Sequence, residues 1–282
     1  MSIYENQARR GTIKKIKEQP IVSLLTDFGL TDPFVAEMKG VILSICPDAK
    51  IIDISHLVGK FDVRASSFVL AAATPHFPPR TIHVAVVDPS VGSERRAIVI
   101  ETNKYLFVGP DNGLMIPAAT IDGILHVYHL TNRSLMCSEI SFTFHGRDIF
   151  APAAAHLACG TAPRECGVEI KDYVKLEFAQ TTLIGRTLTC SVFHVDSFGN
   201  VITNLPKAEL SKLNLKLGAE IRVTVGRRRI SARLVQTYSD LKRGEIGILV
   251  GSHGFLELAY REESFVKRFH VRMGSDVQVY GE

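Results

Sequence analysis

An aspartate and an arginine lie on one short turn that follows an apolar segment. The segment Thr81–Val87 is apolar and leads into Asp88, and the turn after it contains Pro89, Gly92 and Arg95. Because α/β sheets hold ligands at the ends of their strands, these two charged side chains could orient a small polar reactant there. A structural ion pair that holds the turn would explain the same residues equally well.

Three more polar groups follow apolar segments or precede a helix. Asp27 could accept hydrogen bonds from a ligand diol, although aspartates at strand ends also close turns. His56 could be a base or a ligand, but a histidine satisfied by local backbone is the simpler interpretation. His145 precedes a predicted helix, whose N-terminus favours anionic groups. Arg147 and Asp148 are expected to fix this loop and to cap the helix.

Two glycine-containing turns carry further polar residues. The segment Gly109–Gly113, with the sequence Gly-Pro-Asp-Asn-Gly, is interpreted as a turn without a direct chemical role. The segment Asp196–Asn200 is most simply a β-turn with an aromatic residue at its tip. Phe198 and Asn200 could alternatively recognise a flat heteroaromatic ring by stacking and amide hydrogen bonds.

Metal and phosphate sites have little support. A metal site of two acids and two histidines (Asp27, His56, Asp88 and His145) is conceivable, but Arg95 beside Asp88 argues against a bound cation. Sequence motifs for phosphate loops, dinucleotides, zinc proteases and hydrolase nucleophiles are absent. The five cysteines are scattered without CxxC spacing, which is typical of reduced thiols in a cytoplasmic protein. We therefore expect neither a metal nor a cofactor.

The elements that position these groups alternate between strands and helices. Helical spacing of apolar residues predicts helices at 34–45, 63–73 and 149–159, with Asp32 and Asp148 as N-caps of the first and last. Short apolar segments predict strands at 21–25, 51–54, 81–87, 97–101, 105–108 and 124–129. This alternation predicts an α/β N-terminal domain with a largely parallel sheet.

The second part of the chain has a different pattern. Helical periodicity is almost absent there, and short strands separated by turn residues are predicted at 187–195, 220–225, 229–234, 246–250, 255–260 and 276–280. We interpret this as a small all-β barrel or sandwich. The predicted organisation is a flexible basic extension at 1–19, the α/β domain at 20–178 and the β domain at 183–282.

Composition narrows the class of protein. The chain has 282 residues, of which 46% are hydrophobic and 22% charged, as in soluble globular proteins. No apolar segment is long enough to span a membrane, and the N-terminus lacks the features of a signal peptide. The basic N-terminal extension supplies most of the formal net charge of +4, so no nucleic-acid or membrane partner is expected.

Seven segments occur in an order that resembles the S-adenosylmethionine (SAM) hydroxide adenosyltransferase family, which is related to the SAM-dependent fluorinases and chlorinases. They are residues 25–29, 52–56, 86–96, 110–113, 143–148, 196–200 and 251–256. The resemblance implies an α/β domain followed by a β-barrel domain. It also implies a homotrimer, in which the substrate lies between the N-terminal domain of one subunit and the C-terminal domain of its neighbour.

The same resemblance implies a reaction. Hydrolytic members carry an Asp-Arg-His set around a nucleophilic water, and Asp88, Arg95 and His145 match these positions. Halogenating relatives are expected to lack the full set. Water would attack the ribose C5′ of SAM and release adenosine and L-methionine. Because methionine leaves as a neutral thioether, the reaction needs no general acid, only a placed and activated water.

The resemblance further implies a substrate-binding set: Asp27 at the ribose hydroxyls, Phe61 in the pocket wall, Asp196 and Ser252 at the methionine end, Phe198 and Asn200 at the adenine, and Tyr260. The segment 258–264 departs from the family pattern, in which an asparagine and a Gly-Ser-Ala sequence are expected near the adenine. Two alternatives stay open: a halide adenosyltransferase, and a trimeric protein that senses SAM or adenosine with negligible turnover.

Overall fold

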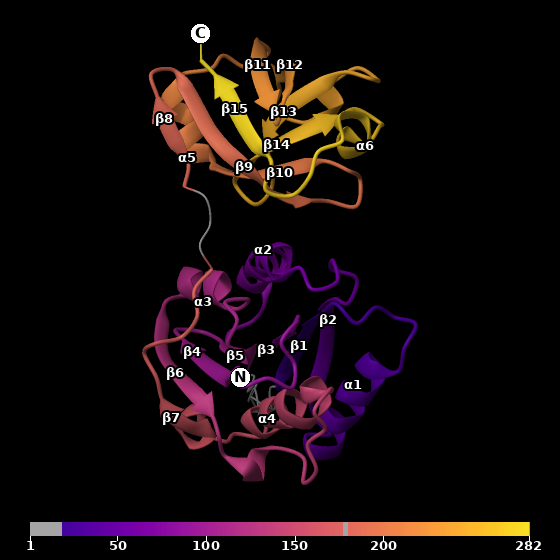
Figure 1. Cartoon of the computed structure of the whole chain (residues 1–282), viewed down its shortest axis with the longest axis vertical. Coiled ribbons are helices and arrows are strands. Elements are labelled where there is room, and N and C mark those ends of the chain that lie inside the picture. The colour runs from indigo at the N-terminus through magenta and orange to yellow at the C-terminus, as the bar shows by residue number, and fades with distance from the viewer. Residues whose placement is uncertain (1–18, 177–179, 282) are drawn as a thin grey trace, which may run out of the picture.

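The computed structural model describes residues 19–176 and 180–281, which form two sheets joined by one connecting segment (Figure 1). The basic extension predicted at 1–19 lies, apart from Gln19, outside the described residues. The predicted domain boundary at 178 also lies outside them. Within the described ranges, no helix combines the length and the apolar character needed to span a membrane.

The first sheet has seven strands among the described residues, in the order β2-β1-β3-β5-β4-β6-β7. Strands β2, β1, β3 and β5 are parallel to one another, and β4 and β7 run against the rest. The predicted mostly parallel sheet is therefore confirmed. The strands are β1 (Ile21–Thr26), β2 (Lys50–Ser55), β3 (Ile82–Val86), β4 (Ala97–Thr102), β5 (Leu106–Pro110), β6 (Ile124–Leu130) and β7 (Gly167–Glu169).

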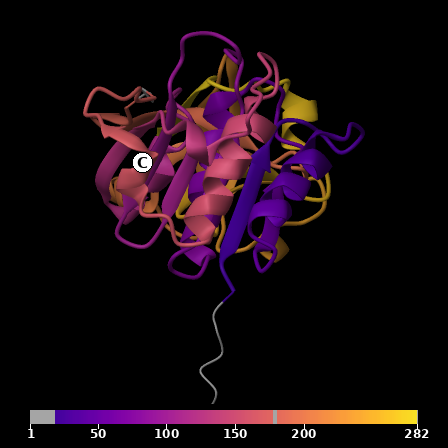
Figure 2. The same ribbon diagram turned by 90° about the horizontal axis from the view of Figure 1, so that it is seen from below.

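Helices cover both faces of this sheet. Alternate side chains of β1 and β3 point to opposite faces: Leu24 and Val84 pack in one core cluster, Leu25 and Ala85 in another. The first cluster includes α1 (Phe34–Ile45) and α4 (Ala151–Ala158), and the second includes α2 (Val63–Ala73) and α3 (Ile116–Asp122). In Figure 1, α2 and α3 lie on the side of the second sheet, and Figure 2 shows α1 and α4 from the opposite side.

Two helix caps predicted from the sequence are wrong. Pro33 occupies the N-cap of α1 without a side-chain hydrogen bond, so Asp32 does not cap that helix. Helix α4 begins only at Ala151, after a π-helical turn at Gly146–Phe150 that contains Asp148. The Asp148 carboxylate cannot cap a helix from inside this turn, and it binds neighbouring donors instead.

The second sheet closes into a barrel, which confirms the predicted β-barrel. Its strand order is β10-β14-β13-β12-β11-β15-β9-β8, and an additional β9–β10 pairing closes a ring of seven strands among the described residues. The strands are β8 (Thr182–Ile184), β9 (Thr187–Val195), β10 (Val201–Pro206), β11 (Glu220–Val225), β12 (Arg228–Leu234), β13 (Ile246–Val250), β14 (Phe255–Tyr260) and β15 (Asp276–Tyr280). Two short helices, α5 (Lys207–Leu210) and α6 (Phe265–Phe269), accompany them.

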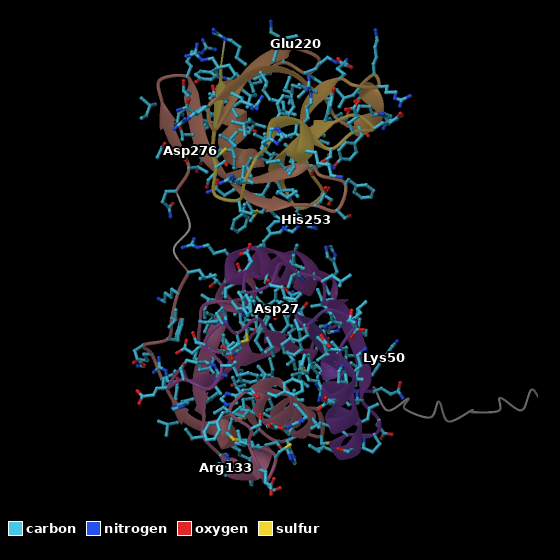
Figure 3. All side chains as sticks on the ribbon, turned by 45° about the vertical axis from the view of Figure 1, so that its right-hand side comes forward. Asp27, Lys50, Arg133, Glu220, His253 and Asp276 are labelled. Carbon is cyan, nitrogen blue, oxygen red and sulfur yellow. The ribbon has the colours of Figure 1, made fainter. Side chains whose placement is uncertain are left out.

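An aromatic contact joins the two parts. The Phe68 ring of α2 stacks on His194, with 5.0 Å between ring centroids, and meets His253 and Phe255 edge-on. Figure 3 shows His253 on the side of the barrel that faces the first sheet, whereas Asp27 lies within the first part. The barrel therefore packs against α2.

Candidate active site

A cavity of about 180 Å³ lies at the C-terminal ends of β1 and β3. This is the edge at which open α/β sheets hold ligands. Chain segments that leave these two strands bring Asp27 and Asp88 to it, and the segment before the π-helical turn brings His145. The predicted candidates in its wall are Asp27, Phe61, Asp88 and His145.

Asp88, Arg95 and His145 form one continuous hydrogen-bonded set. Arg95 donates to Asp88 Oδ2 from Nε at 2.9 Å and from Nη2 at 2.6 Å. The same Nη2 lies 2.6 Å from His145 Nδ1. The Asp88 and Arg95 side chains are only 5% and 9% exposed, so this ion pair is largely removed from water. Arg95 lies behind Asp88 and His145, since these two line the cavity and Arg95 does not.

The contact with Arg95 determines the state of the His145 ring. A guanidinium has only donors and stays protonated, so His145 Nδ1 must be the acceptor and the ring proton must sit on Nε2. Burial lowers the pKa of His145, and the positive charge of Arg95 lowers it further. His145 is therefore a neutral imidazole that can donate a hydrogen bond from Nε2.

A second charged network holds the loop that carries His145. Arg147 donates to Asp148 Oδ1 at 2.6 Å and to Glu37 of α1 at 2.8 Å. Asp148 Oδ2 accepts from the main-chain N–H of Ser141 at 2.9 Å. The Arg147 guanidinium also lies 5.1 Å from the centre of the Phe144 ring. These contacts tie the two ends of the 141–148 segment to each other, and Arg147 ties its C-terminal end to α1.

Asp27 also lines the cavity. Its Oδ2 accepts a hydrogen bond from the main-chain N–H of Phe61 at 2.8 Å. Phe61 has a φ of +60°, an uncommon conformation for an aromatic residue, and its ring is exposed. The bond from Phe61 to the buried Asp27 helps to hold that conformation at the cavity mouth.

His56 does not belong to this cavity. Its Nδ1 lies 2.8 Å from Thr26 Oγ1, and its Nε2 lies 3.1 Å from Asp53 Oδ1. The ring of His56 thus contacts the side chains of Thr26 and Asp53 rather than the local backbone expected from the sequence. Among residues 19–176 and 180–281, no group of three or more acidic, histidine or cysteine side chains could hold a metal ion.

The candidates in the barrel do not line the cavity of their own chain. They are Asp196, Phe198, Asn200, Ser252 and Tyr260. The Asp196 carboxylate accepts from its own turn, including Asn200 N–H at 2.8 Å and Asn200 Nδ2 at 2.9 Å. Phe198 at the tip of the turn is 79% exposed, and Ser252 is exposed as well. The Tyr260 ring packs against Phe269.

Some wall residues were not identified from the sequence. Phe28, Phe34 and Phe144 meet edge-on, with ring centroids 5.1–5.8 Å apart, and form an aromatic wall. Lys60 also lines the cavity. Phe28 and Phe144 lie in loops, where single aromatic residues have no distinguishing spacing, and Phe34 begins α1. No sequence signal therefore separates these rings from ordinary core residues.

Comparison with known proteins agrees with this geometry. The family model of the SAM hydroxide adenosyltransferase N-terminal domain matches residues 22–167, and the model of the C-terminal domain matches residues 190–278. The chain belongs to the SAM hydroxide adenosyltransferase family. The resemblance inferred from the seven ordered segments is thus confirmed. Asp88, Arg95 and His145 fall within the first matched segment, and the barrel candidates fall within the second.

Three relatives show the breadth of the SAM hydroxide adenosyltransferase family around this chain. A protein from Salinispora tropica named (R)-S-adenosyl-L-methionine hydrolase is 40% identical, over 85% of this chain and 90% of the relative. A fluorinase from Nocardia brasiliensis is 28% identical, over 93% and 97%. The crystal structure of an uncharacterized conserved protein from Thermotoga maritima superposes with a TM-score of 0.88 at 38% identity, over 92% of this chain and 99% of that one.

Proposed function

We propose that this protein hydrolyses S-adenosyl-L-methionine to adenosine and L-methionine by attack of an activated water on the ribose C5′. The observation that carries the proposal is the hydrogen-bonded Asp88–Arg95–His145 set at the wall of the cavity. The name of the Salinispora tropica relative, at 40% identity, supports the same reaction, and the fluorinase is less similar at 28%.

The geometry suggests how the three residues divide the work. A water in the cavity can contact Asp88 and the Nε2–H of His145, because both side chains line it. Arg95 reaches the water only through them, so it positions the pair and adds a positive charge that favours developing hydroxide. Arg95 also fixes the orientation of the Asp88 carboxylate through two hydrogen bonds.

The proton acceptor is Asp88 rather than His145 in this proposal. His145 Nδ1 already accepts from Arg95, and Nε2 carries the remaining ring proton, so the neutral ring has no free acceptor. A carboxylate has about four acceptor positions. Asp88 uses some of them for Arg95 and can offer another to the water. His145 would orient the water by donation.

The aromatic wall suits the substrate's charge. The sulfonium of SAM is a cation that is attracted to the faces of aromatic rings. Phe28, Phe34 and Phe144 supply such rings in the cavity. Attack on C5′ converts the sulfonium into a neutral thioether, so positive charge disappears in the reaction. Compared with water, a weakly polar wall favours the neutral thioether over the charged sulfonium.

The proposal assigns the barrel residues to the active site of a neighbouring subunit. Asp196, Phe198 and Ser252 do not line the cavity of their own chain. A homotrimer would place the barrel domain, at 183–282, of one subunit over the α/β domain, at 20–178, of the next and complete the site. Asp27 would bind the ribose hydroxyls, and no metal or cofactor is assigned. We place the activity in the cytoplasm, which agrees with the free cysteines.

A product assay tests the reaction. The purified protein is incubated with SAM, as separate R and S sulfonium epimers, and adenosine and methionine are followed by chromatography beside an Asp88→Ala control. Equal amounts of adenosine and methionine, absent from the control, are expected. Parallel samples in chloride and fluoride buffer would show 5′-halo-5′-deoxyadenosine if the protein were a halide adenosyltransferase. Tight calorimetric binding with SAM recovered intact would instead indicate a sensor and refute the hydrolase proposal.

A further inference from the structure

The turn that carries Asp88 and Arg95 is held at its first end by Asn112. The Asn112 side-chain Nδ2 donates to the main-chain carbonyl of Val87 at 2.8 Å, and Val87 is the buried residue directly before Asp88. Asn112 Oδ1 accepts from the N–H of Leu114 at 3.1 Å. Because Leu114 occupies the amide oxygen, the amide nitrogen is directed at Val87.

The other end of the same turn is held by the preceding residue, Asp111. Its main-chain N–H donates to the carbonyl of Arg96 at 2.9 Å, and Arg96 directly follows Arg95. Its carboxylate accepts from Arg96 Nε at 2.9 Å and lies 2.8 Å from Nη2. The Asp111 side chain is only 2% exposed, so these charged contacts are largely shielded from water.

Between its two ends, the main chain of the turn makes only local hydrogen bonds with the described residues, and the Arg95–Asp88 ion pair spans it. The main-chain bonds include Val91 N–H to Asp88 O at 3.3 Å and Ser93 N–H to Ser90 O at 3.1 Å. Such bonds shape the turn but do not locate it relative to His145 on another segment. Gly92 packs close to the carbonyl of Phe142 on the segment that carries His145, and the two ends of the turn are located by how Val87 and Arg96 are held.

We propose that Asp111 and Asn112 are positioning residues, which together hold both ends of the Asp88–Arg95 turn at the distance where Arg95 meets His145. Only the expected effect on kcat rests on the proposed function, since the position of the turn can be measured without turnover. It assigns a role to the Pro-Asp-Asn-Gly segment, which the sequence suggested was a plain turn. Asp111 also accepts from Val174 N–H at 2.8 Å, which links the same residue to the connecting segment.

The chain offers a matched control for Asn112. Asn103 also donates from its side-chain Nδ2 to a main-chain carbonyl, that of Asp122. It lies in the turn between β4 and β5, at the opposite end of these strands from Asp111. Asn103→Ala therefore removes the same kind of bond from the same domain without touching the catalytic turn.

Two variants and this control are compared by steady-state kinetics and thermal unfolding. Asn112→Ala frees the Val87 carbonyl. Asp111→Asn removes one of the two carboxylates that hold Arg96, the other being Asp172, while it keeps an acceptor for Val174. Because a misplacement of about 1 Å can cost about 10²-fold in rate, we expect kcat to fall about 10- to 100-fold with KM changed less than about threefold. Asn103→Ala should lose thermal stability but keep its kcat.

A crystal structure of each variant gives a second readout that does not depend on turnover. The separation between Arg95 Nη2 and His145 Nδ1, which is 2.6 Å here, should exceed hydrogen-bonding distance in Asn112→Ala and stay unchanged in Asn103→Ala. If the separation is unchanged in both, or if kcat falls equally in both, the positioning role is refuted. A wild-type protein that makes no adenosine would refute the proposed function, and the crystal structures would still decide the positioning role.

Discussion

Asp88 and His145 can be distinguished as proton acceptor by replacing each with an amide of similar shape. Asp88→Asn removes the acceptor charge: the amide oxygen can still accept from Arg95, and the amide nitrogen, which cannot accept a proton, then faces the water. Loss of a general base costs about 10²–10⁴-fold in kcat. His145→Gln keeps a donor near the Nε2 position and loses mainly the 2.6 Å bond from Arg95. Arg95 retains its bonds to Asp88, so the net loss is about one hydrogen bond, or about 1.5 kcal/mol.

That free energy corresponds to a fall in kcat of about tenfold. The assay is adenosine formation at saturating SAM, with single-turnover measurements to separate chemistry from product release. Urea unfolding of each variant checks that the fold is retained, because removing one partner of a buried ion pair can cost about 3–5 kcal/mol. The opposite result would make His145 the proton acceptor. In that case kcat would fall by about 10²–10⁴-fold in His145→Gln, and Asp88→Asn would keep more than a tenth of the wild-type rate.

Three further predictions follow from ionisation and backbone geometry. The pKa of His145 is lowered, so kcat/KM should fall only below the ordinary histidine value of about 6.5; a pH profile with its acid limb at or above that value would contradict this. Burial lowers the pKa of His83 to about 3, so the unfolded chain binds more protons below pH 6.5, and the contribution of this site to the free energy of unfolding should drop by about 4 kcal/mol between pH 6.5 and 3. Urea titrations should show a smaller drop for His83→Asn, and an equal drop would refute the assignment. Gly92→Ala should reduce activity and cost about 2 kcal/mol or more, because Gly92 has a φ of +81° and an added Cβ would lie 2.4 Å from a main-chain carbonyl. Gly160→Ala, at φ +102° in open space, should cost less in the same unfolding assay and leave activity unchanged.

Most of the fold could be predicted because its elements have clear periodicity. The helices at 34–45 and 63–73 are present with the predicted bounds, and the predicted strands of both sheets are present with ends within two residues. Strand β10 was missed although it closes the barrel, since its sequence Val-Ile-Thr-Asn-Leu-Pro ends in residues that are typical of turns. Helix α3 was missed because seven residues are too few to establish a helical period.

The predicted Asp148 cap was wrong for a physical reason that residue spacing does not reveal. An aspartate before an apolar helical pattern is typical of an N-cap, but Asp148 has a stronger partner in the guanidinium of Arg147, 2.6 Å away. That pairing accompanies a π-helical turn before the regular helix. Local propensity indicates where a helix can begin, whereas the contact between Arg147 and Glu37 of α1 is tertiary.

Only part of the candidate site could be predicted from the sequence. Asp27 and Asp88 follow two adjacent parallel strands, so their meeting in one cavity follows from the sheet order. Phe28, Phe144 and Lys60 come from loops whose paths no periodicity reveals, and Phe34 begins α1, where its spacing predicts a helix but not a cavity wall. The barrel candidates lie away from the cavity of their own chain, and a single-chain sequence pattern does not show which subunit's cavity they serve.

Asp88, rather than Arg95, is the member of the ion pair that faces the cavity, and this affects whether water or a halide can act as the nucleophile. Asp88 lines the cavity and Arg95 does not, so an incoming anion meets the carboxylate before the guanidinium. Two like charges about 4 Å apart repel by about 4 kcal/mol at an effective dielectric of about 20, and Arg95 behind the carboxylate offsets part of this. A water meets no such barrier, and it needs the acceptor that a halide cannot use. The same carboxylate therefore favours water and disfavours halide, which the chloride and fluoride arms of the product assay measure directly.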